Sequence, residues 1–216
     1  MRNPLGAREP FKASPELPAV PSLPGGGDVI LGFTRPSRAE LAAAVGRLLP
    51  DLLKPDLDVV FCGINPGLYS AATGHHFARP GNRFWPALHA GGFTGRLLRP
   101  CEDHLLPDGG FGLTNLVRRA TAGAAELSKA ELIEGLSALE KKIRTYRPRW
   151  LAVLGIGAFR TAFQRPRASL GWQEGGFAGA SLWVLPNPSG LNAHHQPAHL
   201  AAAFRALRRA TGCTAL

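Results

Sequence analysis

The chain has 216 residues, of which 45% are hydrophobic, and this length and composition favour one domain with a substantial core over two small ones. Lys and Arg outnumber Asp and Glu by 25 to 15, which gives a formal net charge of +10. A folded body this basic attracts polyanions, and nucleic acid is the usual one. An arginine-rich protein from a high-GC organism would carry the same charge without such a partner.

The three cysteines, Cys62, Cys101 and Cys213, show no C-x-x-C spacing, which argues against a disulfide framework, a zinc site and an iron–sulfur cluster. No apolar stretch approaches transmembrane length, and the first residues lack a signal-peptide pattern. We therefore expect no metal, no cofactor and no membrane partner. The expected state is a monomer in a reducing cytoplasm, associated with the nucleoid if the source is bacterial.

Residues 1–36 contain seven of the nineteen prolines and little periodicity, so we expect a mostly disordered tail before one folded domain at 37–212. In chain order, the patterns predict a helix at 37–53, a strand at 57–62, helices at 82–90 and 96–106, a strand at 111–117, a helix at 128–146, a strand at 150–154, a short helix to 164, a strand at 181–185 and a helix at 197–209. This alternation predicts a three-layer α/β/α sandwich with a mainly parallel central sheet.

Two short blocks, more than a hundred residues apart, each follow an apolar run that predicts a buried strand. They are Gly-Ile-Asn-Pro-Gly at 63–67 and Asn-Pro-Ser-Gly-Leu-Asn at 187–192. A strand that opens into such a turn brings fixed backbone groups and a short polar side chain to the carboxyl edge of the sheet, where α/β proteins bind ligands. We expect the two turns to form one pocket there.

Together with Gly-His-His-Phe at 74–77 and Pro-Gly-Asn-Arg-Phe-Trp at 80–85, these blocks resemble the mismatch-specific uracil-DNA glycosylases. These are bacterial relatives of thymine-DNA glycosylase within the uracil-DNA glycosylase superfamily, and the likeness spans about residues 57–193. It implies a base-excision-repair enzyme that flips uracil, and related 5-substituted pyrimidines, out of double-stranded DNA, notably at G·U mismatches. Hydrolysis of the N-glycosidic bond would leave an abasic site. Because no lysine lies in the blocks, we expect a monofunctional enzyme.

Asn65 stands where more active members of the superfamily have an aspartate. A carboxamide cannot act as a general base at neutral pH, but its carbonyl oxygen can accept a hydrogen bond and orient a catalytic water. Backbone N–H groups of the 63–68 turn, around Ile64, would bind a pyrimidine carbonyl and stabilise the departing base. The alternative is that Asn65 only occupies a left-handed turn position.

Two more side chains are expected to bind the flipped base. Phe77 offers a flat face for stacking, and Asn115, at the end of the 111–117 strand, offers a donor and an acceptor to the O4/N3–H edge of uracil. A core phenylalanine and a strand-capping asparagine are the alternatives. Thymine-DNA glycosylase resembles this chain at Asn115, which implies activity outside G·U pairs. His75 and His76 resemble an active-site segment but would equally suit phosphate contacts or a solvated pair.

The 187–193 block is expected to be a wedge loop. Leu191, an apolar residue in a polar turn, would fill the gap that the flipped base leaves, while groups around Gly190 and Asn192 would read the widowed guanine. Related enzymes often have an arginine at the position of Ala193, so its loss implies a looser mismatch preference. Candidates for phosphate contacts are Arg79, Arg83 and Ser189, with His194 and His195 weaker, although such loop side chains are often only solvated.

Charged residues outside the blocks carry weaker expectations. Lys141, Lys142 and Arg144 are predicted to form a solvated helix face. Asp103 and Asp108 are expected near the opposite edge of the sheet, although one of them could polarise a water for Asn65.

Two functions of other classes stay open. One is a non-catalytic DNA- or RNA-binding module that keeps the fold as a damage sensor. The other is a nucleotide-handling enzyme that uses the Gly-Ile-Gly turn at 155–157 for phosphate, although this turn lacks the rest of a G-x-G-x-x-G pattern.

Overall fold

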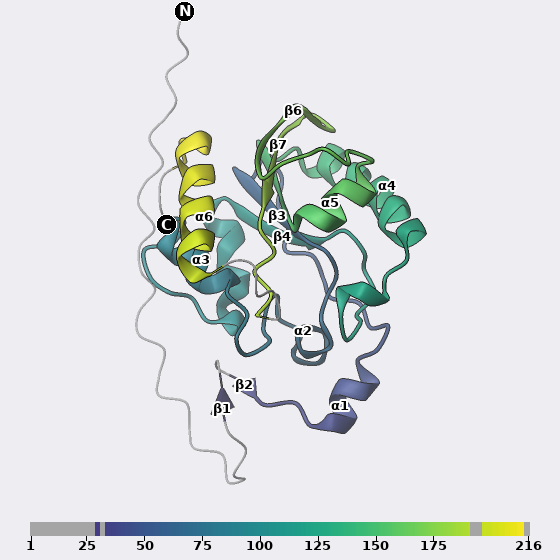
Figure 1. The fold of residues 1–216 in the computed structure, drawn as a ribbon. Coiled ribbons are helices and arrows are strands. Elements are labelled where there is room, and N and C mark those ends of the chain that lie inside the picture. The colour runs from purple at the N-terminus through teal and green to yellow at the C-terminus, as the bar shows by residue number, and fades with distance from the viewer. Residues whose placement is uncertain (1–28, 31–32, 191–195, 214–216) are drawn as a thin grey trace, which may run out of the picture.

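The computed structural model describes residues 29–30, 33–190 and 196–213 (Figure 1). In chain order its elements are β1 (Val29–Ile30), β2 (Phe33–Thr34), α1 (Arg38–Ala43), β3 (Val59–Gly63), α2 (Leu68–Thr73), α3 (Phe84–Ala90), the 3₁₀ helix η1 (Pro100–Gly109), β4 (Phe111–Asn115), the 3₁₀ helix η2 (Ala124–Glu126), α4 (Lys129–Tyr146), β5 (Trp150–Leu154), α5 (Ile156–Ala162), β6 (Gly171–Phe177), β7 (Ala180–Leu185) and α6 (Pro197–Thr211).

The central sheet has the strand order β4-β3-β5-β7-β6, and only the edge strand β6 runs antiparallel to its neighbour. Helices α3 and α6 lie together on one side of the sheet, and α4 and α5 lie together on the other (Figure 1). The predicted three-layer sandwich with a mainly parallel sheet is therefore confirmed. Its carboxyl edge collects the turns that follow β3, β4, β5 and β7.

Strand β3 is buried on both faces, and its alternating side chains supply two separate cores. Val59 and Phe61 pack into the layer that contains α3 and α6. The Phe61 ring stacks on Phe204 at a centroid distance of 5.9 Å and meets Phe93 edge-on at 5.3 Å. Val60 and Cys62 pack into the layer that contains α4 and α5. The continuous apolar run at 57–62 thus has the composition expected of a central parallel strand.

The predicted helix at 37–53 is wrong in its second half, because α1 ends at Ala43. Gly46 takes a left-handed conformation, with φ of +75°, and donates its N–H to Ala120 O. Pro50 lacks the N–H that a helix interior requires. The chain instead extends beside the sheet, where Leu52 pairs with Leu113 of β4.

Strand β6 was not predicted, because no alternation of apolar and polar residues marks its sequence, Gly-Trp-Gln-Glu-Gly-Gly-Phe. In the structure its register against β7 is irregular. The segment predicted as a helix at 96–106 is the 3₁₀ helix η1, displaced to 100–109. Of the predicted tail, residues 1–28 lie outside the described residues, and β1 pairs with β2 in the part that is described. No helix among the described residues is long and apolar enough to cross a membrane.

Lys142 corrects the predicted solvated face of α4. Its side chain is only 17% exposed, and its Nζ lies 2.7 Å from Asp51 Oδ2 and 2.9 Å from Thr114 Oγ1. Thr114 in turn donates to Asp51 Oδ1. The ammonium group is therefore part of a polar cluster beside β4, while Lys141 and Arg144 are exposed as predicted.

Candidate active site

A cleft of about 340 Å³ opens at the carboxyl edge of the sheet. Its walls come from the turn after β3 and the start of α2, the 76–82 segment, the end of β4, the 121–124 loop and the 187–189 turn. Both sequence blocks therefore meet at one cavity, as the parallel topology requires. The predicted residues that line it are Ile64, Asn65, His76, Phe77, Arg79, Asn115 and Ser189.

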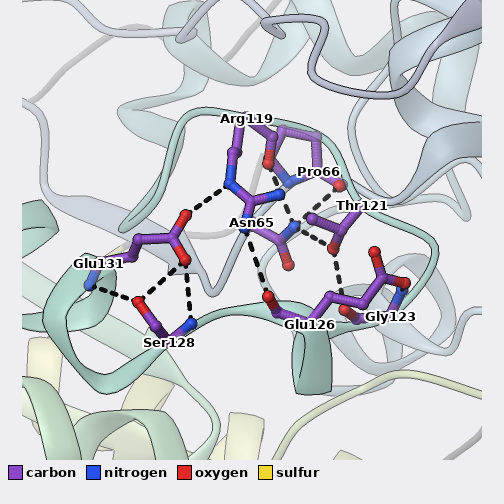
Figure 2. A network of polar contacts seen from close by, with 8 residues as sticks. All are labelled: Asn65, Pro66, Arg119, Thr121, Gly123, Glu126, Ser128 and Glu131. Carbon is purple, nitrogen blue, oxygen red and sulfur yellow. Dashed lines mark hydrogen bonds and ion pairs between the residues drawn. The ribbon is translucent and has the colours of Figure 1, made fainter.

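The Asn65 side chain is held by the loop that follows β4. Its Nδ2 lies 2.7 Å from Thr121 Oγ1 and 3.2 Å from each of the backbone carbonyls of Arg119 and Pro66 (Figure 2). These acceptors surround one end of the planar carboxamide. Figure 2 shows the amide oxygen directed away from them, and no described residue donates a hydrogen bond to it.

Thr121 determines which end of the Asn65 amide faces the loop. The Thr121 hydroxyl donates to the carbonyl of Gly123 at 2.9 Å, so its oxygen is left as an acceptor for Asn65 Nδ2. A flipped carboxamide would place its own oxygen against the carbonyls of Pro66 and Arg119, with no proton between them. The hydrogen-bond network thus leaves Asn65 Oδ1 available to accept a bond from a water or a ligand in the cleft.

Phe77 lines the cleft with an aromatic ring that is supported from behind. Its ring stacks on Phe84 at a centroid distance of 4.0 Å and an interplanar angle of 21°. Phe77 also adopts φ of +53°, a left-handed conformation that is costly for a bulky residue. The ring packs against the core and also forms part of the cleft wall. Its position is therefore compatible both with a core phenylalanine and with a surface on which a base stacks.

Asn115 ends β4 opposite Gly63, the last residue of β3. The residue is 5% exposed and lines the cleft. A Cβ atom at Gly63 would lie 2.5 Å from Asn115 Oδ1 and 3.5 Å from the Phe77 ring. The absent side chain at Gly63 is therefore what lets the amide and the ring approach the same space.

His75 and His76 have different surroundings. His76 is 2% exposed and lines the cleft, and its Nε2 lies 2.9 Å from Pro50 O. Burial lowers the pKa of His76, although the bond to Pro50 and the charge of Asp103 oppose this shift. His75 Nδ1 lies 3.2 Å from Asp103 Oδ1 and its ring is partly exposed.

The expected position of Asp103 at the opposite edge is wrong. η1 folds back beside the 75–76 turn, so that Asp103 Oδ2 accepts the backbone N–H of His76 at 2.9 Å. Both carboxylate oxygens thus bind the histidine turn, and Asp103 is not part of the cleft wall. Asp108 is exposed and forms an ion pair with Lys54. Neither position supports the suggestion that one of these carboxylates polarises a water beside Asn65.

The first half of the predicted wedge loop is packed against the 81–83 segment. Arg83 donates its backbone N–H to Pro188 O at 2.9 Å and its Nη2 to Ser189 O at 2.7 Å. A Cβ at Gly190 would lie 2.5 Å from Gly81 O, so this approach requires a glycine. Arg83, expected to contact phosphate, therefore holds the loop in this structure, while Arg79 is exposed at the cleft. Leu191, Asn192, Ala193, His194 and His195 lie outside the described residues.

The family model of the uracil DNA glycosylase superfamily matches residues 50–208, well over half of the chain. The chain belongs to the uracil DNA glycosylase superfamily. The solution structure of a putative uracil DNA glycosylase from Methanosarcina acetivorans superposes with a TM-score of 0.51 at 19% identity, covering 76% of this chain and 99% of that one. That likeness shows a shared fold. At the family level the chain is thus a DNA glycosylase that removes uracil, and the mismatch-specific branch stays a prediction.

The sequence did not identify the residues that hold Asn65. Thr121 and Arg119 lie 54 to 56 positions from it, in a loop with no recognisable motif. The capping box formed by Ser128 and Glu131 was visible in the sequence, but its link to Arg119 was not. In the described ranges no group of three His, Cys, Asp or Glu side chains is arranged to hold a metal ion.

Proposed function

We propose that the protein is a monofunctional, mismatch-specific uracil-DNA glycosylase that removes uracil from G·U pairs and leaves an abasic site. The observation that carries the proposal is the Asn65 carboxamide, fixed through Nδ2 by the 119–121 loop while Oδ1 stays available. It lies in one cleft with the Phe77 ring and the Asn115 amide. The partner is double-stranded DNA, and the proposed acting species is a monomer inside the cell.

The chemistry follows from these groups. The flipped uracil stacks on Phe77 and presents its O4/N3–H edge to Asn115, which offers a donor and an acceptor. The bond between C1′ of the sugar and N1 of the base breaks, and its electron pair leaves with the base. A water that donates a hydrogen bond to Asn65 Oδ1 adds to C1′, and its proton passes to solvent because a carboxamide is not a base at neutral pH. Slow turnover, limited by leaving-group quality, is the expected consequence.

Substrate preference is a separate part of the proposal. An alanine at position 193 supplies no side chain that reads the opposite strand, and the asparagine at position 115 resembles thymine-DNA glycosylase. Both residues support release of uracil opposite adenine as well as guanine. Related 5-substituted uracils with better leaving groups are proposed as further substrates. A leucine wedge at position 191 would fill the gap in the duplex.

Single-turnover base release tests this function. Labelled duplexes with uracil opposite guanine or adenine, and single-stranded uracil, are compared for the wild type and Asn65→Ala. We expect release from G·U that falls about 100-fold in the variant, since a reacting group displaced by about 1 Å already costs about 10²-fold in rate. Duplex affinity and melting temperature serve as controls. Tight duplex binding without release from any substrate would indicate a damage-binding module instead.

A further inference from the structure

We propose that Arg119 and Glu131 are positioning residues for the uracil-removal reaction: together they fasten the loop that orients Asn65 to the N-terminus of α4. The inference rests on the proposed function, in which Asn65 orients the attacking water. Neither residue lines the cleft, so both would act through the Asn65 carboxamide and not on the substrate.

The first link joins Asn65 to the 119–121 loop. Two of its three acceptors, Arg119 O and Thr121 Oγ1, belong to this loop, so the position of the loop sets the position of the carboxamide. The backbone of the loop is bonded on both sides, from Ala120 N to Arg47 O at 2.9 Å and from Thr121 N to Pro66 O at 3.1 Å. The side chain of Arg119, at the start of the loop, bonds to residues outside the loop.

The second link joins Arg119 to α4 (Figure 2). Its Nε lies 2.5 Å from Glu131 Oε1, and its Nη2 lies 3.3 Å from Glu126 O. Glu131 Oε2 accepts from the backbone N–H of Ser128 at 2.9 Å, completing the capping box that begins α4. A charge-assisted bond between a guanidinium and a carboxylate fixes direction as well as distance. The carboxamide in the cleft is therefore connected to an 18-residue helix.

The exposure of this ion pair separates positioning from folding. The side chains of Arg119 and Glu131 are 38% and 31% exposed, and ion pairs at such sites contribute little to global stability. Catalytic geometry is more demanding than stability, because a displacement of a fraction of an ångström in a reacting group already lowers the rate. Loss of the pair should thus lower the rate without unfolding the protein.

Glu131→Gln is the decisive variant. A glutamine can still accept from Ser128 N and keep the capping box, but it cannot form the ion pair with Arg119. Glu40→Gln is the matched control, because Glu40 completes the equivalent capping box with Ser37 on α1 and has no ion pair with a described residue. Both variants change the net charge equally, so non-specific attraction to DNA is balanced between them.

Single-turnover uracil release from a G·U duplex is measured with duplex affinity and melting temperature. We expect Glu131→Gln to release uracil about fivefold to tenfold more slowly, a loss typical of slightly misplaced reacting groups, with both other quantities unchanged. Arg119→Lys keeps the charge but not the fork that reaches Glu126 O, and should fall between Glu131→Gln and the wild type. Glu40→Gln should match the wild type in all three.

A readout without DNA separates this proposal from the proposed function. The side-chain NH₂ signals of Asn65, assigned by their loss in Asn65→Asp, should shift and exchange faster with water in Glu131→Gln, while those of Asn115 stay in place. Unchanged Asn65 signals, or an unchanged rate in an active enzyme, overturns the proposal. A fall in melting temperature with shifts at both asparagines also overturns it, because the pair would then serve folding alone. If the wild type releases no uracil, the proposed function fails, and the NMR comparison still shows whether the Arg119–Glu131 ion pair positions the Asn65 carboxamide.

Discussion

At the scale of single residues, the hydroxyl of Thr121 combines two bonds whose directions depend on each other. It donates to Gly123 O and accepts from Asn65 Nδ2, so a residue with no acceptor there would remove the shortest of the three hydrogen bonds that hold the carboxamide. We expect Thr121→Val to lower the single-turnover rate of uracil release by about tenfold, equivalent to about 1.4 kcal/mol and the usual net value of one hydrogen bond. Thr121→Ser keeps the hydroxyl and should stay near the wild-type rate. Equal rates for both variants would contradict the assigned orientation.

The buried ring of His76 predicts a dependence of stability on pH. Its pKa is lowered in the fold, chiefly by burial, so the unfolded chain binds more protons when the pH falls below about 6.5. The stabilisation that the neutral His76 ring contributes to the fold is fully present above about pH 6.5, and it is lost as the pH falls toward the lowered pKa. We expect the melting temperature to drop between pH 7 and 5, and His76→Gln to flatten this part of the profile. A slope unchanged by the substitution would show that His76 does not titrate there.

At the scale of elements, α4 approaches the chain after β4 so closely that a glycine is required. A Cβ at Gly135 would lie 2.5 Å from Leu116 O, whereas one at Gly157 in α5 would meet nothing within 4 Å. Alanine raises helix propensity at both positions. We nevertheless expect Gly135→Ala to lower the free energy of unfolding by about 1–3 kcal/mol, because the added methyl group overpacks the contact with Leu116. Gly157→Ala should raise the free energy of unfolding by about 0.5–1 kcal/mol. Chemical denaturation of both variants tests the pair, and stabilisation by Gly135→Ala would disprove the close approach.

Elements were predictable from the sequence where local chemistry decides them. The capping box at Ser128 and the apolar spacing after it identified α4, and unbroken apolar runs identified β3 and β5. The helix predicted through residue 53 failed because Gly46 and the extended segment beside β4 depend on contacts with Leu113 and Ala120, which lie far away in the chain. Strand β6 is paired on one side only and needs no apolar alternation, so its sequence gave no signal.

The candidate site also has a part that the sequence predicts and a part that depends on distant contacts. The carboxyl ends of parallel strands lie at one edge of a sheet, so the sequence alone was enough to place the block at 63–67 beside Asn115. The supports behind them could not, since Thr121 reaches Asn65 and Asp103 reaches His76 across 56 and 27 positions of chain. A motif identifies the groups that face a ligand, whereas the groups that hold them are determined by how loops pack.

At the scale of the whole molecule, a net charge of +10 predicts that binding to undamaged duplex weakens steeply with salt, because each phosphate contact releases counterions. Arg79 is exposed at the cleft, whereas Arg144 is paired with Glu140 near the far end of α4. Both substitutions to alanine remove one positive charge. We expect Arg79→Ala to reduce the slope of log affinity against log salt by about 0.9, the value for one phosphate contact, and Arg144→Ala to leave the slope unchanged.

Affinity titrations of a short uracil-free duplex over a series of salt concentrations measure these slopes. A smaller slope for Arg79→Ala alone would place the DNA backbone along the cleft mouth, because net charge is the same in the two variants. Equal slopes for both variants and the wild type would mean that the Arg79 side chain is solvated in the complex. An equal reduction in both would mean that the charge acts through the overall field, and that the basic composition attracts DNA without a defined track beside the cleft.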